Sequence, residues 1–477
     1  MKRYEALAEE IAQSIRSGVM KLGDRLPSVR QASISRSVSP STVFAAYYLL
    51  EARGLIRARE RSGYYVSAGA KTAPPEPEAP SSPDSESAPV DVSDLVLSVL
   101  ESARARDVVP FGSAFPSPLL FPLPRLARSM AASVQGMDAW STVSDLAPGN
   151  ATLRRQIALR YLADGVNVHM DEIVITNGAL EALNLSLQAV TRPGDSVIIE
   201  SPTFYAALQA LERGGLKAIE VPTHPREGID LAALALALER HRPKACWLMT
   251  NFQNPLGSSM PDAKKKALVE LLARFDVPLI EDDVYGELYF ASKRPAHAKL
   301  FDSKGLVMHC SSFSKCMAPG YRIGWVAAGQ FTKQIARQQL TSTLSASAPA
   351  QAAIADYLQK GGYDKHLRQL RHVLSLQQNA MIEAVARHFP KGTKATRPEG
   401  GYFLWVELPG KVDVLAIHQH ALALGISVAP GPMFSARREF GNCLRLNYGH
   451  PWDDRAEGAF VTLARLIAAH TVALDSA

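Results

Sequence analysis

The chain has 477 residues, of which 47 % are hydrophobic and 21 % are charged. This composition indicates a globular protein, and the length exceeds the roughly 250–300 residues at which single cores stop growing, so more than one domain is expected. No apolar run is long enough to predict a membrane span, and the N-terminus lacks the features of a signal peptide. The four cysteines show no Cys-x-x-Cys spacing, which favours reduced thiols and a cytoplasmic location.

The formal net charge of +6 is distributed unevenly along the chain. Residues 1–70 hold eleven Lys or Arg against six Asp or Glu, whereas residues 71–100 hold one Lys against six acidic residues. The acidic stretch, "KTAPPEPEAPSSPDSESAPVDVSD", is rich in Pro and Ser and poor in apolar residues, which is typical of linkers. The pattern predicts a basic domain over residues 1–67, a flexible linker over 68–104 and a large domain over 105–477.

The basic part has the pattern of three helices followed by a β-hairpin. Apolar residues recur at helical spacing between residues 4 and 15, and a second, short helix is expected after Pro27. The third helix has Ser39 as its N-cap, Pro40 at its first helical position and Gly54 as its stop. The stretch "LIRARERSGYYV" then predicts two short strands, with arginines at 57, 59 and 61.

These elements resemble a known DNA-binding module. The segments "GDRLPSVR", "SPSTVFAAYYLLEARGLI" and "SGYYV" are similar to the winged helix-turn-helix of the GntR family of bacterial transcription regulators, over residues 1–67. Members of that family often have glycine where Ser37 stands. The resemblance implies that operator DNA is a partner, that Arg30 anchors a phosphate, and that Gly63 lets the wing approach the minor groove. The DNA-binding residues that it implies are Arg30, Ser39, Ser41, Thr42, Arg61 and Gly63.

A plainer interpretation is that these arginines form the solvated face of a small helical domain. The charge, the order of the elements and the wing together favour DNA binding.

The rest of the chain alternates strand-like and helical segments. "DEIVITNG" precedes the helical "ALEALNLSLQAV", and "DSVIIESP" precedes "TFYAALQALERGG". This alternation predicts an α/β domain with a mostly parallel sheet, in which ligands bind at the carboxyl ends of the strands. Four polar residues lie just beyond strand-like runs, where separate strands would bring them together: Asn254, Asp282, Tyr285 and Lys315.

This set suits the chemistry of pyridoxal 5'-phosphate. A lysine amine forms a Schiff base with a carbonyl cofactor, and the pyridine nitrogen of pyridoxal phosphate needs an acidic partner. Lys315 and Asp282 are the candidates for these two roles, while Tyr285 and Asn254 are suited to hydrogen-bond the phenolic oxygen.

The phosphate of such a cofactor needs several donors and its ring needs a cover. Backbone amides at the start of the helix after "TNG", together with Ser312 and Arg322, are predicted to bind the phosphate, and Phe204 to stack on the ring. The complete predicted set is Gly178, Ala179, Leu180, Phe204, Asn254, Asp282, Tyr285, Ser312, Lys315 and Arg322. The histidines show no metal-ligand spacing, so no metal site is predicted.

A second resemblance covers residues 108–470. "NFQNPLG", "EDDVYGEL", "SSFSKCMAPGYRIGW" and "CLRLNYG" follow the order of signatures in fold-type I class I/II aminotransferases. The resemblance implies a large pyridoxal phosphate domain with a smaller C-terminal α+β subdomain, Lys315 as the catalytic lysine, and Arg445 as the clamp for a substrate or effector carboxylate. Taken alone, Arg445 is equally well explained by a structural role. Two positions depart from the family pattern: Ala114 replaces a common glycine, and Ser144 replaces a tyrosine.

The fusion of the two parts resembles the MocR subgroup of GntR regulators, in which the large domain is a sensor in a head-to-tail homodimer. Two hypotheses stay open. The protein is a transcription regulator that holds pyridoxal phosphate through Lys315 and senses an amino compound or the cofactor itself, or it is a working aminotransferase whose DNA binding is secondary. A third, in which the large domain is only a dimerisation scaffold, predicts that Lys315→Ala changes neither spectrum nor regulation.

Overall fold

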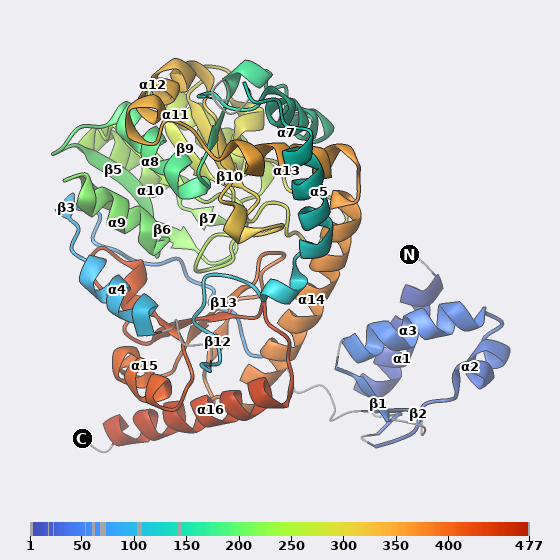
Figure 1. The fold of residues 1–477 in the computed structure, drawn as a ribbon. Coiled ribbons are helices and arrows are strands. Elements are labelled where there is room, and N and C mark those ends of the chain that lie inside the picture. Colours follow the sequence, from blue (N-terminus) through green and yellow to red (C-terminus); the bar gives the residue numbers. More distant parts are fainter. Residues whose placement is uncertain are drawn as a thin grey trace.

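The computed structural model describes residues 3–17, 19–21, 23–52, 54–59, 63–66, 73–102, 107–140 and 146–475. It has a small N-terminal helical part beside a large α/β part (Figure 1). Among the residues it describes, none of the helices combines the length and apolar character that crossing a bilayer requires.

The N-terminal part is the predicted winged helix. Its elements are α1 (Arg3–Arg16), α2 (Val29–Ser35), α3 (Pro40–Ala52), β1 (Ile56–Arg59) and β2 (Gly63–Val66). Helix α3 starts at Pro40 as predicted, and the Ser39 hydroxyl accepts a hydrogen bond from the Thr42 amide at 3.2 Å. Strands β1 and β2 pair antiparallel. Ser37 has φ 50°, so the turn before α3 uses the left-handed conformation that glycine adopts most readily.

The acidic segment differs from the predicted flexible linker. From residue 73 it lies on the large domain, with β3 (Ala88–Pro89) added to the main sheet beside β6 and α4 (Ser93–Ser102) packed against α9. Val92 and Val96 are fully buried. The acidic residues pair with arginines of the large domain, as in Glu76 with Arg226 at 2.6 Å. The expectation of an unstructured linker is therefore corrected for residues 73–102, because a few valines and complementary charges hold them in place.

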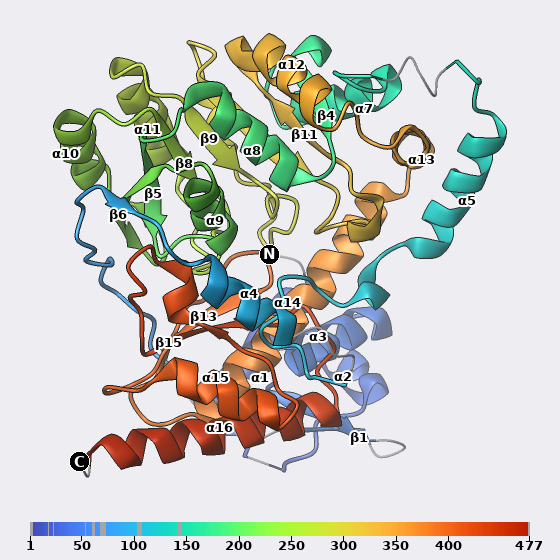
Figure 2. The ribbon, with the colours of Figure 1, turned by 60° about the vertical axis from the view of Figure 1, so that its left-hand side comes forward.

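The large domain is built on a nine-stranded mixed sheet whose central strands are parallel. The order is β3-β6-β5-β8-β9-β10-β11-β4, with β7 beside β6. Strands β8, β9 and β10 are buried along their whole length, as expected for a sheet covered on both faces (Figure 2). The strands are β4 (Ile173–Thr176), β5 (Ser196–Ser201), β6 (Lys217–His224), β7 (Gly228–Ile229), β8 (Ala245–Leu248), β9 (Leu279–Asp282), β10 (Val307–Ser312) and β11 (Gly324–Ala327).

Helices surround this sheet on both sides (Figure 2). They are α5 (Leu123–Gln135), α7 (Ala151–Ala163), α8 (Ala179–Val190), α9 (Tyr205–Arg213), α10 (Leu231–His241), α11 (Asp262–Arg274), α12 (Thr332–Ser342), α13 (Ala348–Gln359) and α14 (Tyr363–His388). Short 3-10 helices lie at Pro118–Leu120, Met170–Glu172, Ala298–Phe301, Pro319–Tyr321, Gly329–Phe331 and Gly431–Phe434.

A smaller C-terminal subdomain contains a four-stranded antiparallel sheet of order β12-β13-β15-β14. Its elements are β12 (Lys394–Ala395), β13 (Phe403–Glu407), α15 (Val414–Ala423), β14 (Ala429–Pro430), β15 (Cys443–Asn447) and α16 (Asp454–Asp475). Helix α14, with 26 residues, runs from the large sheet towards this subdomain (Figure 1). The predicted fold class, including the smaller α+β subdomain, is confirmed.

Candidate cofactor site and DNA-binding surface

The predicted polar residues meet where the central strands end. Asp282 is the last residue of β9, and Lys315 follows the end of β10 by three residues. Asn254 lies in the loop after β8, which is the other neighbour of β9. Arg445 comes from β15 in the smaller sheet, and its Nη1 donates to Oδ1 of Asn254 at 3.1 Å. Adjacent parallel strands and one strand of the smaller sheet therefore form a common site.

Lys315 lies in a setting that favours a neutral amine. Its Nζ donates to the carbonyl oxygen of Ala114 at 2.8 Å and lies 3.8 Å from the centre of the Phe115 ring. Burial, the charge of Arg445 and the charge of Arg322 lower the pKa of the lysine to about 7, although Asp282 acts in the opposite direction. A large share of the amine is therefore unprotonated near neutral pH, as a nucleophilic lysine requires.

Asp282 is a buried carboxylate without a donor. It is fully buried, and neither carboxylate oxygen has a hydrogen-bond partner within the described part of the chain. Burial and the neighbouring charge of Asp283 raise its pKa to about 7, against the opposing effects of Lys315 and of the Val284 backbone amide, which lies beyond good hydrogen-bond geometry. Because an unpaired buried carboxylate is costly, this position fits a ligand that brings its own positive N–H group.

Arg445 is a buried guanidinium without a counter-charge. Its exposed fraction is 1 %, and its Nη2 donates to the carbonyl oxygen of Gly112 at 2.7 Å. Burial lowers its pKa, whereas Tyr205, Tyr285 and Tyr402 act in the opposite direction, and the nearby charge of Lys315 has the same sign. The Nδ2 of Asn254 beside it also has no partner among the described residues. Arg445 therefore has the surroundings of a group that receives a carboxylate.

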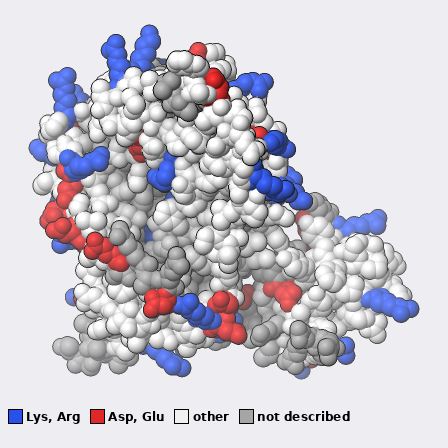
Figure 3. Space-filling model, viewed as in Figure 1, with Lys and Arg blue, Asp and Glu red and all other residues white. Residues whose placement is uncertain are grey.

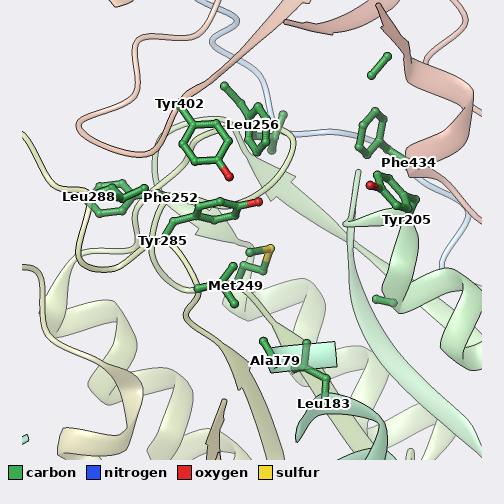
Figure 4. Packing of buried hydrophobic residues seen from close by; sticks show 14 of the residues in the cluster. Ala179, Leu183, Tyr205, Met249, Phe252, Leu256, Tyr285, Leu288, Tyr402 and Phe434 are labelled. Carbon is green, nitrogen blue, oxygen red and sulfur yellow. The ribbon is translucent and has the colours of Figure 1, made fainter. Parts of the chain in front are cut away.

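Aromatic side chains form the wall between these groups. The ring of Tyr285 lies 5.4 Å from the ring of Tyr402, and Figure 4 shows the two hydroxyl groups close to each other. The Tyr402 hydroxyl donates to the Ala114 carbonyl, which also accepts from Lys315. Phe204 is at the N-cap position of α9 and is half-buried. The centre of its ring lies 4.8 Å from the centre of the Tyr205 ring. Sequence reasoning missed Tyr402, although it follows the double glycine in "PEGGYF".

The start of α8 forms a cradle for an anion. Gly178 precedes the helix with φ 85°, and Nη2 of Arg322 lies 2.5 Å from the position that a Cβ of Gly178 would take. The same Nη2 donates to the Asn177 carbonyl at 3.2 Å, and Nη1 donates to the Ser314 hydroxyl at 3.4 Å. The Gly178 amide itself donates to the Thr176 carbonyl at 2.8 Å, so the amides of Ala179 and Leu180, combined with Arg322, are the donors that fit a phosphate.

Two serines lie at this cradle. The predicted Ser312 is buried, and its hydroxyl accepts from the Ser314 amide at 3.4 Å. The hydroxyl of Ser314 contacts Arg322 and was not predicted, although the motif "SFSK" places serines both one and three residues before the lysine. The side chain of Leu180 is 44 % exposed, so only its backbone amide suits the predicted role. The predicted Ser144 lies outside the described residues.

We expect Gly178→Ala to weaken the binding of pyridoxal phosphate. The substitution forces a residue with Cβ into positive φ and pushes Arg322 out of the cradle, and backbone strain of this kind costs about 1–3 kcal/mol. Gly165→Ala is the matched control, because Gly165 has φ 80° but no atom within 4 Å of the added Cβ. Titration with pyridoxal phosphate measures both variants, and equal affinities would contradict a steric role of Gly178.

Asp283 lies next to Asp282 in a very different environment. Its Oδ2 accepts from Nδ1 of His297 at 3.2 Å, Nε2 of His309 at 3.1 Å and Nη2 of Arg294 at 3.1 Å. Its hydrogen bonds with His297 and His309 hold its pKa well below the usual range, despite burial. The two histidines and Asp283 are close enough to share a metal ion, but the guanidinium on the same oxygen disfavours a cation there.

The winged helix presents the predicted DNA-binding face to solvent. Arg30, Ser39 and Ser41 are exposed, and Thr42 is partly buried. The Ser39 hydroxyl lies 2.9 Å from that of Ser41 and 2.8 Å from that of Thr42. In Figure 3, Lys and Arg side chains lie on the side of this part that faces away from the large domain.

The wing is described only in part. Gly63 begins β2 with φ 101°, a conformation that glycine adopts at no steric cost. Arg61 and the side chains of the other two wing arginines lie outside the described residues, so their predicted contacts with DNA stay predictions.

We expect Arg30→Ala to reduce the salt dependence of binding to any double-stranded DNA. A residue that contacts one phosphate contributes about 0.9 to the slope of log affinity against log salt. Arg36→Ala is the control, because Arg36 already forms an ion pair with Glu10. Fluorescence anisotropy at several salt concentrations measures the slopes. An unchanged slope for Arg30→Ala would contradict the predicted contact between Arg30 and a phosphate.

A winged helix-turn-helix joined to an aminotransferase-type α/β domain defines a two-domain regulator class. Residues 3–66 match the model of bacterial regulatory proteins of the gntR family, and residues 128–459 match that of class I and II aminotransferases. The chain therefore belongs to the GntR regulators that carry a class I/II aminotransferase domain, the MocR type.

Relatives share this two-part organisation over nearly the whole chain. The uncharacterized HTH-type transcriptional regulator YdcR of Escherichia coli (strain K12) is 50 % identical over 98 % of this chain and 99 % of its own. YjiR of the same organism, also an uncharacterized HTH-type transcriptional regulator, is 39 % identical over 94 % of this chain and 96 % of its own.

Among solved structures, the large domain is similar to LysN, the α-aminoadipate aminotransferase of Thermus thermophilus. That structure contains N-(5'-phosphopyridoxyl)-L-leucine. The identity is 28 %, the TM-score is 0.72, and the match covers 81 % of this chain and 100 % of LysN. Pyridoxal phosphate is the cofactor of this family. The unpaired Asp282, the unpaired Asn254 amide and the anion cradle at Gly178 fit that cofactor.

Proposed function

We propose that the protein is a DNA-binding transcription regulator that holds pyridoxal phosphate at Lys315 and senses an amino compound, or the cofactor itself. The observation that carries this proposal is Arg445, a buried guanidinium with no acidic partner among the described residues, in the same site as a lysine of lowered pKa. A site with these two groups suits a molecule that has both an amine and a carboxylate.

Each residue has a separate task in this proposal. When bound, the cofactor supplies a carbonyl carbon for an amine and an electron-withdrawing ring. The Asp282 carboxylate holds the proton on the ring nitrogen, and Tyr285 and Asn254 donate hydrogen bonds to the phenolic oxygen. Burial raises the pKa of Tyr285, so its hydroxyl keeps its proton and stays a donor.

The other predicted residues bind the remaining groups of the ligands. The amides of Ala179 and Leu180, with Ser312 and Arg322, bind the phosphate, Gly178 lets the backbone approach it closely, and Phe204 covers the ring. Arg445 binds the carboxylate of the amino compound by two parallel hydrogen bonds, which a lysine would not provide.

We propose that the protein acts on operator DNA as a homodimer. Exposed apolar side chains on the large domain support an interface between two copies there, since Leu119 is 85 % and Trp140 76 % exposed. The resemblance to MocR regulators implies a head-to-tail arrangement, which cross-linking between domains would test. As the similar regulators are bacterial, the proposed place of action is the cytoplasm, where the DNA lies.

The absorption spectrum of the protein with pyridoxal phosphate tests the proposal. We expect a visible band from the Schiff base with Lys315 and no such band in Lys315→Ala. Addition of single amino acids is expected to change the band of the wild-type protein without releasing a 2-oxo acid. Absence of the band in the wild-type protein would overturn the cofactor assignment and leave a DNA-binding scaffold.

An active aminotransferase is the second candidate function. The retention of Lys315, Asp282, Tyr285 and Arg445 in one site favours it. Stoichiometric release of a 2-oxo acid from an added amino acid, repeated over several turnovers with an acceptor oxo acid, would support this function. Deletion of residues 1–70 would then abolish DNA binding and leave the turnover intact.

A further inference from the structure

The acidic segment before the large domain contacts two separate parts of that domain. We call residues 73–91 the acidic strap. On the side of the nine-stranded sheet, its strand β3 pairs with β6 at the sheet edge (Figure 2). The Ser81 amide donates to the Thr223 carbonyl at 3.2 Å, and the Thr223 amide donates to Oγ of Ser81 at 3.0 Å. The strap is therefore fixed to the large sheet at two places.

The same strap contacts the smaller C-terminal subdomain. The Ala395 amide in β12 donates to the carbonyl oxygen of Pro75 at 2.9 Å. Nη1 of Arg437 lies 2.7 Å from Oδ2 of Asp84 in an ion pair. Arg437 belongs to the loop before β15, the strand that contains Arg445. The strap thus holds both the first strand of this subdomain and the loop that leads to Arg445.

One carboxylate of the strap lies between the two parts. Oε1 of Glu76 lies 2.6 Å from Nη2 of Arg226, in the turn between β6 and β7, and 3.6 Å from Nε of Arg397, in the C-terminal subdomain. The Glu76 side chain is only 15 % exposed, so solvent screens these pairs less than it screens a typical surface ion pair. Glu76 therefore connects the large sheet with the subdomain.

The other end of the strap repeats this arrangement. The Glu86 carboxylate pairs with Arg240 of α10, while its carbonyl oxygen accepts from Nη2 of Arg437 at 3.3 Å. The carbonyl oxygen of Asp91 accepts from Nη2 of Arg438 at 3.0 Å. Five arginines from the two parts form what we call the arginine surface: Arg226, Arg240, Arg397, Arg437 and Arg438.

The strap covers a joint at which the two parts also touch directly. Oε1 of the buried Glu220 in β6 accepts from the Ser201 hydroxyl and from the Ala436 amide, both at 3.2 Å. The Ser81 hydroxyl of the strap donates to the Ser201 carbonyl. Since Ala436 directly precedes Arg437, a movement of this loop would change contacts of the strap and of β6 together.

The two parts supply different groups to the cofactor site. Lys315, Asp282 and the anion cradle at Gly178 belong to the large sheet and its helices, whereas Arg445 belongs to β15. A ligand whose amine meets the cofactor and whose carboxylate meets Arg445 has to span the joint. Its affinity therefore depends on the position of one part relative to the other.

The strap docks on its own chain and leaves the winged helix free to lie against the other chain of a dimer. Val92 and Val96, directly after the strap, are buried in the main hydrophobic core, and only residues 103–106 separate α4 from the described chain at residue 107. On the other side, residues 67–72 lead to the winged helix, and seven extended steps span up to about 25 Å.

We propose that the arginine surface is the docking surface of the protein's own acidic strap, and that the docked strap holds the C-terminal subdomain where Arg445 receives a carboxylate. The docking is independent of any ligand. The consequence for carboxylate binding rests on the proposed function.

Hydrogen exchange tests the docking in the cofactor-free protein. Glu76→Arg places a third positive charge between Arg226 and Arg397, so we expect peptides containing Ala395 and Thr223 to exchange about fivefold faster, both together. Glu78→Arg is the matched control, because Glu78 is exposed and forms no ion pair with the described residues. Equal exchange in the two variants, or faster exchange in only one of the two peptides, would overturn the docking.

A charge swap separates loss of the ion pair from general damage. Glu76→Arg combined with Arg397→Glu places opposite charges at the same two positions again. We expect slow exchange to return in both peptides. Exchange as fast as in Glu76→Arg alone would contradict an ion pair across the joint.

Two ligands test the consequence for carboxylate binding. N-(5'-phosphopyridoxyl)-L-leucine has a carboxylate, whereas pyridoxamine 5'-phosphate has the same ring and phosphate without one. We expect Glu76→Arg to weaken binding of the first about fivefold and binding of the second less than about twofold, as measured by calorimetry. Equal weakening of both would overturn the role of the strap. A wild-type protein that does not prefer the first ligand would contradict the proposed function instead, and the exchange result would keep its own meaning.

Discussion

Asp282→Asn should stabilise the cofactor-free protein while it removes its response to amino compounds. Among the described residues, no donor makes a hydrogen bond of good geometry to the buried Asp282 carboxylate, which lies beside the ionised Asp283. A neutral amide avoids the buried charge, although it also lacks a partner, so a net gain of about 1–3 kcal/mol in unfolding free energy is expected near pH 8. With pyridoxal phosphate bound, the same change removes the partner of the ring nitrogen.

The stabilising effect of Asp282→Asn should depend on pH. The pKa of Asp282 is about 7 in the folded protein and about 3.9 in an unfolded chain. Since the folded state binds the proton more tightly, the wild-type carboxylate destabilises the protein most above pH 7, and this effect disappears as the pH falls towards 4. The advantage of Asp282→Asn should therefore be large at pH 8 and small near pH 4.5, as measured by urea unfolding of the cofactor-free proteins.

Asp283→Asn is the matched control with the opposite sign. Its carboxylate is paired with Arg294, His297 and His309, and the loss of one partner from a buried ion pair typically costs about 3–5 kcal/mol. Since its folded pKa lies below the normal value, the contribution of Asp283 is present above pH 4 and is lost in acid. Equal effects of the two substitutions would contradict the assignment of the two neighbouring carboxylates.

The second large effect is expected at Arg445. Arg445→Ala should keep the pyridoxal phosphate band, because Lys315, Asp282 and the phosphate cradle are unchanged, and should lose the response to amino acids. Removal of one partner of a buried, hydrogen-bonded charge pair typically costs about 2–5 kcal/mol in binding free energy. Titration of the spectral change with amino acids measures this loss.

Arg445→Lys separates charge from geometry. It keeps the positive charge but not the planar fork that holds a carboxylate by two hydrogen bonds, so a partial response at higher amino acid concentrations is expected. Unfolding curves for both variants check that the protein stays folded, since Arg445 packs against the Phe403 ring at 4.2 Å. A wild-type response in Arg445→Ala would place the carboxylate site elsewhere.

Short-range patterns determined much of this protein from its sequence. The caps at Ser39 and Gly54 and the hairpin after α3 predicted the winged helix, because capping and turn signals act over a few residues. Polar residues after buried strands predicted a site containing Lys315 and Asp282, because parallel strands end at the same edge of a sheet.

The sequence did not predict the long-range contacts. The acidic segment looked like a linker, since its few valines gave no periodic signal. Its docking is explained by arginines of the large domain and by the burial of Val92 and Val96 in the main hydrophobic core. The sequence "EDD" likewise does not distinguish Asp282 from Asp283.

Tertiary structure decided which of the two carboxylates is paired. Successive residues of an extended chain point to opposite sides, so Asp283 meets His297, His309 and Arg294 from other segments while Asp282, at the end of β9, faces the other side. Residue types and local spacing thus determined the two domains and the chemistry of Lys315. The tertiary structure decided the protonation of neighbouring acids and the docking of the acidic segment, because both depend on groups far apart in the chain.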